Sequence, residues 1–354
     1  MLIRLVTPAP AGSFHGNRVT ASRWARLLRD LGHRVRIAQD YRGEPCDLLV
    51  ALHARRSYEA VSFYKKQRHG APLIVALTGT DLYGDLRKSR KARMALEWAD
   101  ALVLLQPLGA AALPAHLRGK ARAIIQSAVK PVRAIHAPRG EFRVCVLAHL
   151  RPVKDPLLAA AACRNLPDAS RIRVLHLGRA LTSGMEKKAR KEMAREPRYR
   201  WLGEVPRSRA LSILAGSRLL LLTSRLEGGA NAVSEALAAG VPVLSSRIPG
   251  SIGILGHGYT GFFPAGDARA LARLLDRCES DTAFYRRLRE HCRGLSPLVR
   301  PSRERAAWKR LLGEIRFPAR RRPDRAHRAS RLGGGGVRRV SGSDSPWVCP
   351  SQQR

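Results

Sequence analysis

Residues 219–235 read LLLLTSRLEGGANAVSE, a run that joins an apolar segment to a glycine turn and then to a helical pattern. The leucines at 219–222 predict a short buried strand, and residues 232–239 have the composition of a helix. A strand that leads through a short loop into a helix is the building unit of an open sheet of parallel strands. This stretch therefore assigns the second half of the chain to the α/β class.

Similar apolar runs recur on both sides of this stretch, mostly separated by segments long enough for a helix. They lie at residues 2–6, 35–38, 48–52, 73–77 and 101–105, and again at 143–147, 173–177 and 243–245. Alternation of this kind predicts doubly wound sheets whose faces are covered by helices.

The rhythm of strands and helices breaks at residues 130–141, which contain Pro131, Pro138 and Gly140. We place a domain boundary there. The prediction is two Rossmann-like domains at residues 1–135 and 136–316, the second with a closing helix, followed by a disordered basic tail at 317–354.

The chain has 354 residues, with 65 Lys and Arg against 27 Asp and Glu, and a net charge of +38. Such an excess attracts polyanions, but here it is spread along the chain, and aromatic residues make up only 5%. We therefore expect no specific nucleic-acid partner.

Six cysteines stand apart without zinc-ligand or disulfide spacing, which fits a reducing cytoplasm. No run of about 18 apolar residues predicts a transmembrane segment, although weak peripheral membrane contact stays open.

The glycine turn at Gly228 and Gly229 carries the strongest chemical signal. Glycine lets backbone approach a ligand closely, and the helix that begins near Asn231 offers free N–H groups to phosphate or sugar oxygens. Glu227 precedes the turn, facing a bound sugar, and Glu235 lies inside the helix, where it can accept hydrogen bonds from a diol. The alternative is a simple tight turn with Glu235 on a helix surface.

Three loops of the first half also follow predicted strands, where open sheets bind ligands. Gly16, Asn17 and Arg18 open the first helix and suit an anionic acceptor. His53 can transfer a proton or simply form hydrogen bonds with the backbone of its loop. Asp81 can orient the acceptor or cap a helix.

The Glu-x7-Glu element, continued by ALAAGVPV at residues 236–243, resembles the donor-site motif of retaining GT-B glycosyltransferases of family 4. The resemblance covers about residues 1–315 in domain order and implies a cleft between the two domains. It implies that Glu227 contacts the donor sugar and that Glu235 contacts the ribose. The backbone around Gly228, Gly229, Asn231 and Ala232 would then bind sugar and phosphate.

The same resemblance implies that Arg151 and Lys154 neutralise the diphosphate as UDP leaves, and that Val205 lies where the base is read. The family often spaces the two cations more widely, so their geometry stays open, as does the alternative of solvated side chains. The chain contains no Asp-x-Asp motif, so we expect neither a metal nor another cofactor, with UDP-sugar as co-substrate.

The loops of the first domain, together with LRPVKDP at residues 150–156, resemble the selenosugar synthases of selenoneine biosynthesis. That resemblance implies selenophosphate as acceptor and a UDP-sugar such as UDP-N-acetylglucosamine as donor. Two alternatives stay open. One is a family-4 hexosyltransferase that acts on a lipid or polysaccharide hydroxyl at the inner membrane. The other is a basic nucleic-acid-associated protein with an inactive GT-B scaffold.

Overall fold

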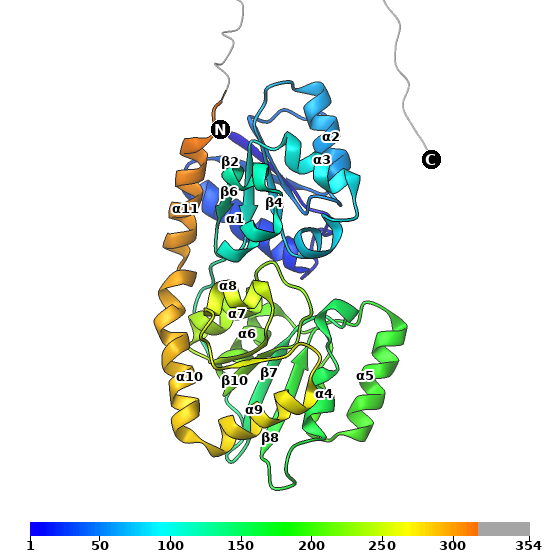
Figure 1. The fold of residues 1–354 in the computed structure, drawn as a ribbon, viewed down its shortest axis with the longest axis vertical. Coiled ribbons are helices and arrows are strands. Elements are labelled where there is room, and N and C mark those ends of the chain that lie inside the picture. Colours follow the sequence, from blue (N-terminus) through cyan, green and yellow to red (C-terminus); the bar gives the residue numbers. More distant parts are fainter. Residues whose placement is uncertain (318–354) are drawn as a thin grey trace, which may run out of the picture. The chain divides into compact units, whose positions relative to one another are not determined.

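The computed structural model describes residues Met1–Phe317, which form two sheets of six parallel strands each (Figure 1). The first sheet has the order β2-β1-β3-β4-β5-β6. Its strands are β1 (Leu2–Val6), β2 (Arg34–Ala38), β3 (Leu48–Leu52), β4 (Leu73–Leu77), β5 (Ala101–Leu104) and β6 (Ala121–Ala123).

The second sheet has the order β12-β11-β10-β7-β8-β9. Its strands are β7 (Phe142–Leu147), β8 (Ile172–Leu177), β9 (Tyr199–Trp201), β10 (Leu219–Leu222), β11 (Val243–Ser246) and β12 (Phe262–Phe263). The order turns back between β7 and β10, as in doubly wound nucleotide-binding sheets. The predicted fold class, two Rossmann-like α/β sheets, is confirmed.

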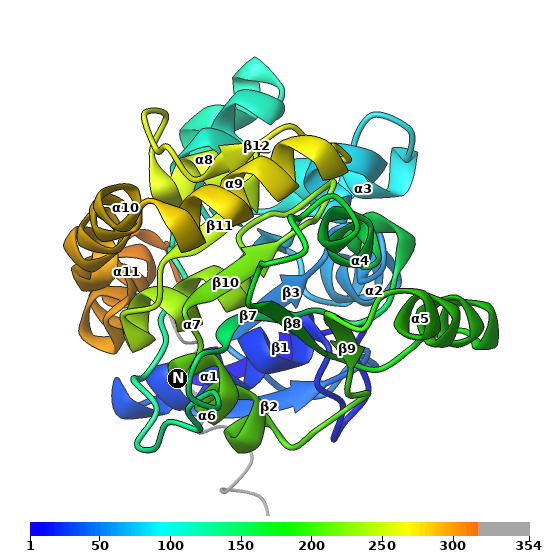
Figure 2. The same ribbon diagram turned by 90° about the horizontal axis from the view of Figure 1, so that it is seen from below.

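Helices connect the strands and cover the sheets. The α-helices are α1 (Gly16–Asp30), α2 (Tyr58–Gln67), α3 (Arg90–Trp98), α4 (Leu158–Cys163), α5 (Ser183–Arg195), α6 (Arg207–Ala215), α7 (Asn231–Ala239), α8 (Pro249–Leu255), α9 (Ala268–Ser280), α10 (Thr282–Leu295) and α11 (Pro301–Glu314). The shorter turns are η1 (Asp81–Asp85), η2 (Pro107–Ala112), η3 (Ala115–Lys120), η4 (Pro152–Lys154) and η5 (Ser296–Val299). Figure 2 shows α4 and α9 on one side of the second sheet, with α6 and α7 on the other.

The continuous apolar runs of the first sheet are explained by burial of both its faces. Along β3, Leu49 and Ala51 belong to one hydrophobic cluster, whereas Leu48, Val50 and Leu52 belong to another. Successive side chains of a strand point to opposite faces, so a strand covered on both sides has no polar position.

The last described helix, α11, packs on the first sheet although it follows the second in sequence. Its Trp308 side chain meets Trp24 of α1, with ring centroids 4.9 Å apart, and Leu311 and Leu312 join the same cluster. The domain limits at 135 and 316 stay predictions, and from residue 318 onward the predicted tail lies outside the described residues. Among residues 1–317, no helix combines the length and apolar character needed to cross a bilayer.

Candidate active site

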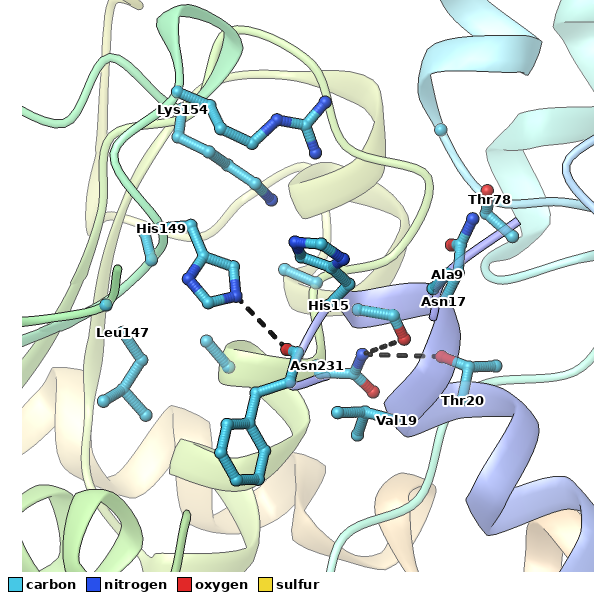
Figure 3. A pocket seen from close by; sticks show the side chains of 18 of the residues that line it. Ala9, His15, Asn17, Val19, Thr20, Thr78, Leu147, His149, Lys154 and Asn231 are labelled. Carbon is cyan, nitrogen blue, oxygen red and sulfur yellow. Dashed lines mark hydrogen bonds between the residues drawn. The ribbon is translucent and has the colours of Figure 1, made fainter. Parts of the chain in front are cut away.

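The order of each sheet indicates where its ligand site should be. In doubly wound sheets, ligands bind beyond the carboxyl ends of the strands at the point where the strand order reverses. These points lie between β1 and β3 in the first sheet and between β7 and β10 in the second. The loops after all four strands line one pocket of about 460 Å³ (Figure 3).

The loop that follows β10 is packed so tightly that two of its positions accept only glycine. A Cβ atom added to Gly228 would lie 2.6 Å from the carbonyl carbon of Thr78, and one added to Gly229 would lie 2.7 Å from Leu105. The helix α7 begins at Asn231, and its N-cap residue Ala230 makes no side-chain cap. The N–H groups of Val233 and Ser234 donate to the Ala230 carbonyl oxygen, which leaves those of Asn231 and Ala232 available to an anion.

Lys154 and Glu227 meet because two neighbouring loops of the second sheet are bonded together. The Thr223 hydroxyl donates to the Lys154 carbonyl oxygen at 2.9 Å, and Ser224 Oγ donates to Glu227 Oε1 at 2.6 Å. Lys154 Nζ also donates to Glu227 Oε1. The predicted positive and negative groups are thus already paired, and a bound diphosphate would have to compete with Glu227 for Lys154.

Glu235 is likewise buried and paired. It accepts a hydrogen bond from Arg207 Nη2, at the first position of α6, and both residues line the pocket near Val205. Glu235 therefore lies in the cavity and not on a helix surface.

A group of basic side chains surrounds Lys154. Burial and the positive charge of Arg56 lower the pKa of the Arg151 guanidinium, and burial and the charge of Arg151 lower the pKa of His15. Figure 3 shows His15 beside His149, with ring centroids 5.4 Å apart. Basic groups that lower each other's pKa indicate a site of concentrated positive potential. A bound anion would offset this repulsion.

His53 has a strained backbone at the edge of this site, with φ of 75°. Its Nδ1 accepts from the Arg56 N–H at 3.3 Å, which leaves Nε2 to donate to Thr80 Oγ1 at 3.1 Å. Burial lowers the pKa of His53, so its ring is neutral at pH 7. Positive φ at a residue other than glycine is typical of functional sites.

The structure brings most of the predicted site residues together, although their roles stay predictions. Those that line the pocket are Gly16, Asn17, His53, Arg151, Lys154, Val205, Glu227, Gly229, Asn231, Ala232 and Glu235.

Three predicted site residues do not line the pocket. Gly228 packs against the backbone of Thr78 and Gly79, and Arg18 lies on α1 away from the lining. Asp81 is fully buried and accepts from the N–H groups of Ala54, Thr78, Gly79 and Leu82. Its carboxylate therefore holds the loops after β3 and β4 together. This structural role resembles the helix cap that the sequence offered as the alternative to acceptor binding.

Among the pocket residues that the sequence analysis did not assign are Arg56, His149, Arg207 and Gln126. Arg56 and His149 follow β3 and β7, so their position after a strand was a usable signal. Arg207 and Gln126 reach the pocket only through tertiary packing. Within residues 1–317, no three His, Cys, Asp or Glu side chains are grouped as a metal site requires.

Comparison with known proteins relates this architecture to one enzyme class. Residues 131–294 match the family described as glycosyl transferases group 1. The fold is similar to HepE of Anabaena, solved with UDP and glucose, at 16% identity and a TM-score of 0.71, covering 89% of this chain and 100% of that one. It is also similar to sucrose-phosphate synthase of Thermosynechococcus elongatus, at 15% identity and a TM-score of 0.70, covering 88% and 98%. The GT-B fold and the predicted enzyme class, a glycosyltransferase, are confirmed.

Proposed function

We propose that this chain, which carries a glycosyl transferases group 1 domain at residues 131–294, moves a sugar from a UDP-sugar to a small anionic acceptor and releases UDP. The observation that carries the proposal is one pocket lined by two buried carboxylates, Glu227 and Glu235, and by the cations Arg151 and Lys154. The structures of HepE with UDP, and with UDP-glucose, support a UDP-sugar as donor.

In this proposal the second sheet binds the donor. Glu235 accepts hydrogen bonds from the ribose hydroxyls, the backbone near Val205 meets the base, and the first turn of α7 binds phosphate oxygens. Negative charge grows on the diphosphate as the sugar leaves, and Arg151 and Lys154 balance that charge. Because protein cations fill this role, the reaction needs no divalent metal.

The first sheet then binds the acceptor, for which we propose selenophosphate. Arg56 lines the pocket and carries a charge suited to phosphate oxygens, while His53 is neutral. Selenium is a soft nucleophile that needs little help from a base, and both ring nitrogens of His53 already have hydrogen-bond partners. We further propose that the donor is UDP-N-acetylglucosamine, that the enzyme belongs to family 4 and that it acts in the cytoplasm.

A hydroxyl acceptor on a lipid or polysaccharide is the second candidate. Two pocket residues favour it, because Phe14 and Leu181 line the cavity yet are 45% and 39% exposed. Exposed apolar side chains at the edge of a site can bind an apolar or sugar-bearing acceptor.

Incubation of the full-length protein with a panel of UDP-sugars tests the proposal. UDP and any selenosugar phosphate are followed by mass spectrometry, with and without selenophosphate. Release of UDP that depends on selenophosphate is the expected result. Release that instead depends on added lipid or glycan favours the second candidate, and no release with any donor contradicts the proposed function.

A further inference from the structure

A buried ion pair lies behind the donor-side loop, outside the pocket lining. Glu304 of α11 has no exposed side-chain surface and accepts hydrogen bonds from Arg23 Nε at 3.0 Å and Trp24 Nε1 at 2.7 Å. It also accepts from the backbone N–H of Ser127 at 2.8 Å and from the Ser127 hydroxyl. One carboxylate thus joins α1, α11 and the segment that leaves β6.

The other end of the Arg23 guanidinium faces the loop that precedes α7. Arg23 Nη1 donates to Asn231 Oδ1 at 2.8 Å, and Asn231 in turn faces Thr20 of α1 (Figure 3). Arg23 belongs to the first sheet's helix, whereas Asn231 opens the helix of the proposed donor site. The contact therefore crosses from one sheet's layer to the other.

Gln126 completes the connection. In the amide orientation that gives each donor an acceptor, its nitrogen donates to the Gly229 carbonyl oxygen at 2.8 Å and to Asn231 Oδ1 at 3.3 Å. Its oxygen accepts from Arg23 Nη2 at 3.1 Å. Three nitrogens of one guanidinium are thus used in a planar fork, a geometry that lysine cannot reproduce.

The placement of this network decides what it can do. Arg23 and Glu304 do not line the pocket, whereas Gln126, Gly229 and Asn231 do. A buried ion pair offers little net stability compared with apolar packing, because both charges lose their water. Its contacts here hold the side chain of Asn231 directly and reach the carbonyl of Gly229 through Gln126, at the point where α7 begins.

We propose that Arg23, anchored by Glu304, is a positioning residue for the donor site. It holds the 229–231 backbone in the geometry that binds the donor diphosphate, and it makes that geometry depend on the packing of α11 against α1. This inference rests on the proposed function, because it takes the 229–231 segment to be the donor-binding segment.

The test is Arg23→Lys in the full-length protein. Lysine keeps a charge for Glu304 but loses the fork to Asn231 and Gln126. We expect the Kd for UDP, measured by calorimetry, and the donor KM to rise about tenfold, the lower end for a charged hydrogen bond. The acceptor KM and the melting temperature should stay near those of the wild type. Arg26→Lys, at an exposed position of the same helix, is the matched control and should change neither constant.

A double-mutant cycle with Asn231→Ala separates positioning from general destabilisation. If Arg23 acts through Asn231, Arg23→Lys should raise the Kd for UDP much less in the Asn231→Ala background than in the wild type. Independent, additive effects, or an unchanged Kd in Arg23→Lys, would overturn the inference alone. A wild-type protein that does not bind UDP would overturn the proposed function, and this inference with it.

Discussion

Arg55 and Arg56 are neighbours in the chain, yet only Arg56 lines the pocket. Arg55 Nε lies 2.8 Å from Asp85 Oδ2, and the residue does not line the pocket. Arg56 lines the pocket, and its charge contributes to the lowered pKa of Arg151 from the second sheet. The sequence predicted that Arg18 binds the acceptor, but Arg18 does not line the pocket. We therefore expect Arg56 to bind the acceptor instead.

We predict that Arg56→Ala raises the acceptor KM by about tenfold or more, the effect of losing a charged hydrogen bond, and changes the donor KM far less. Arg151→Ala should do the reverse, because Arg151 follows β7 on the donor side. Steady-state kinetics with each substrate varied in turn measure both constants. Arg55→Ala and Arg18→Ala serve as controls. If Arg56→Ala changed only the donor constants, the first sheet would not bind an anionic acceptor through this loop.

For single residues, the sequence predicted pocket positions correctly where the residues belong to one continuous motif. Glu227, Gly229, Asn231 and Glu235 all line the pocket because the strand, turn and helix that carry them are contiguous. It did not predict the hydrogen bonds of Asp81, whose carboxylate accepts from four backbone N–H groups of two loops. Three of these donors lie within three residues of Asp81, but the fourth, Ala54, is brought to it only by the pairing of β3 with β4.

Among the loops, the turn after β4 packs directly against the turn after β10. Gly79 has φ of 133°, and a Cβ atom there would lie 2.5 Å from the backbone nitrogen of Gly228. Because both partners at this contact are backbone, neither can move aside without shifting its whole loop.

Gly79→Ala should therefore separate the two loops and lower kcat/KM by about tenfold or more, since a shift of about 1 Å in a positioned site has effects of this size. Gly84→Ala is the matched control, because a Cβ atom at Gly84 meets no atom within 4 Å. Circular dichroism and thermal melts establish that both variants fold. Equal activity of the two folded variants would show that the loops need not touch during turnover.

His176 of β8 links the sheet interior to the loop after β7. Its Nε2 donates to the Ala148 carbonyl oxygen at 2.9 Å, and its Nδ1 accepts from the Tyr199 hydroxyl at 2.8 Å. Burial lowers the pKa of His176 to about 4. The unfolded chain binds this proton below about pH 6.5, whereas the folded chain does so only near pH 4, so stability falls as the pH drops through this window.

We predict that the free energy of unfolding loses about 2 kcal/mol between pH 7 and pH 5 through His176 alone. In His176→Gln, the difference between the two pH values should shrink by about that amount, while His69→Gln, an exposed control, should keep it. Urea denaturation of the wild type and of both variants at the two pH values gives the three differences. An unchanged pH dependence in His176→Gln would mean that this ring takes up its proton as readily when folded as when unfolded.

Strands could be predicted from the sequence where they consist of a continuous apolar run. The strands at residues 2–6, 48–52, 73–77 and 219–222 are found with the predicted limits. The strands β6 and β12 were missed because they lie at sheet edges and have only three and two residues. The helix α5 cannot be predicted from an apolar stripe, because only Ala189 of its residues is buried.

Over the whole of residues 1–317, the feature least accessible to sequence reasoning is the return of α11 to the first sheet. The pattern of Trp308, Leu311 and Leu312 predicts an amphipathic helix, but it does not say which core that helix joins. The bonds of Glu304 to Arg23 and Trp24 span 281 and 280 positions of the chain. Such contacts follow from the assembled fold, and a local pattern cannot encode them.

The central claim is that the pocket shared by the two sheets binds a UDP-sugar through protein side chains. The most direct measurement is a calorimetric titration of UDP into the full-length protein in buffer containing EDTA. We predict saturable binding at one site, and a Kd about tenfold to a hundredfold higher in Glu235→Ala, because a buried ribose diol loses its charged acceptor. Glu186→Ala, on α5 and outside the pocket lining, should bind as the wild type does. Absence of UDP binding, binding only after magnesium is added, or an unchanged Kd in Glu235→Ala would contradict the account.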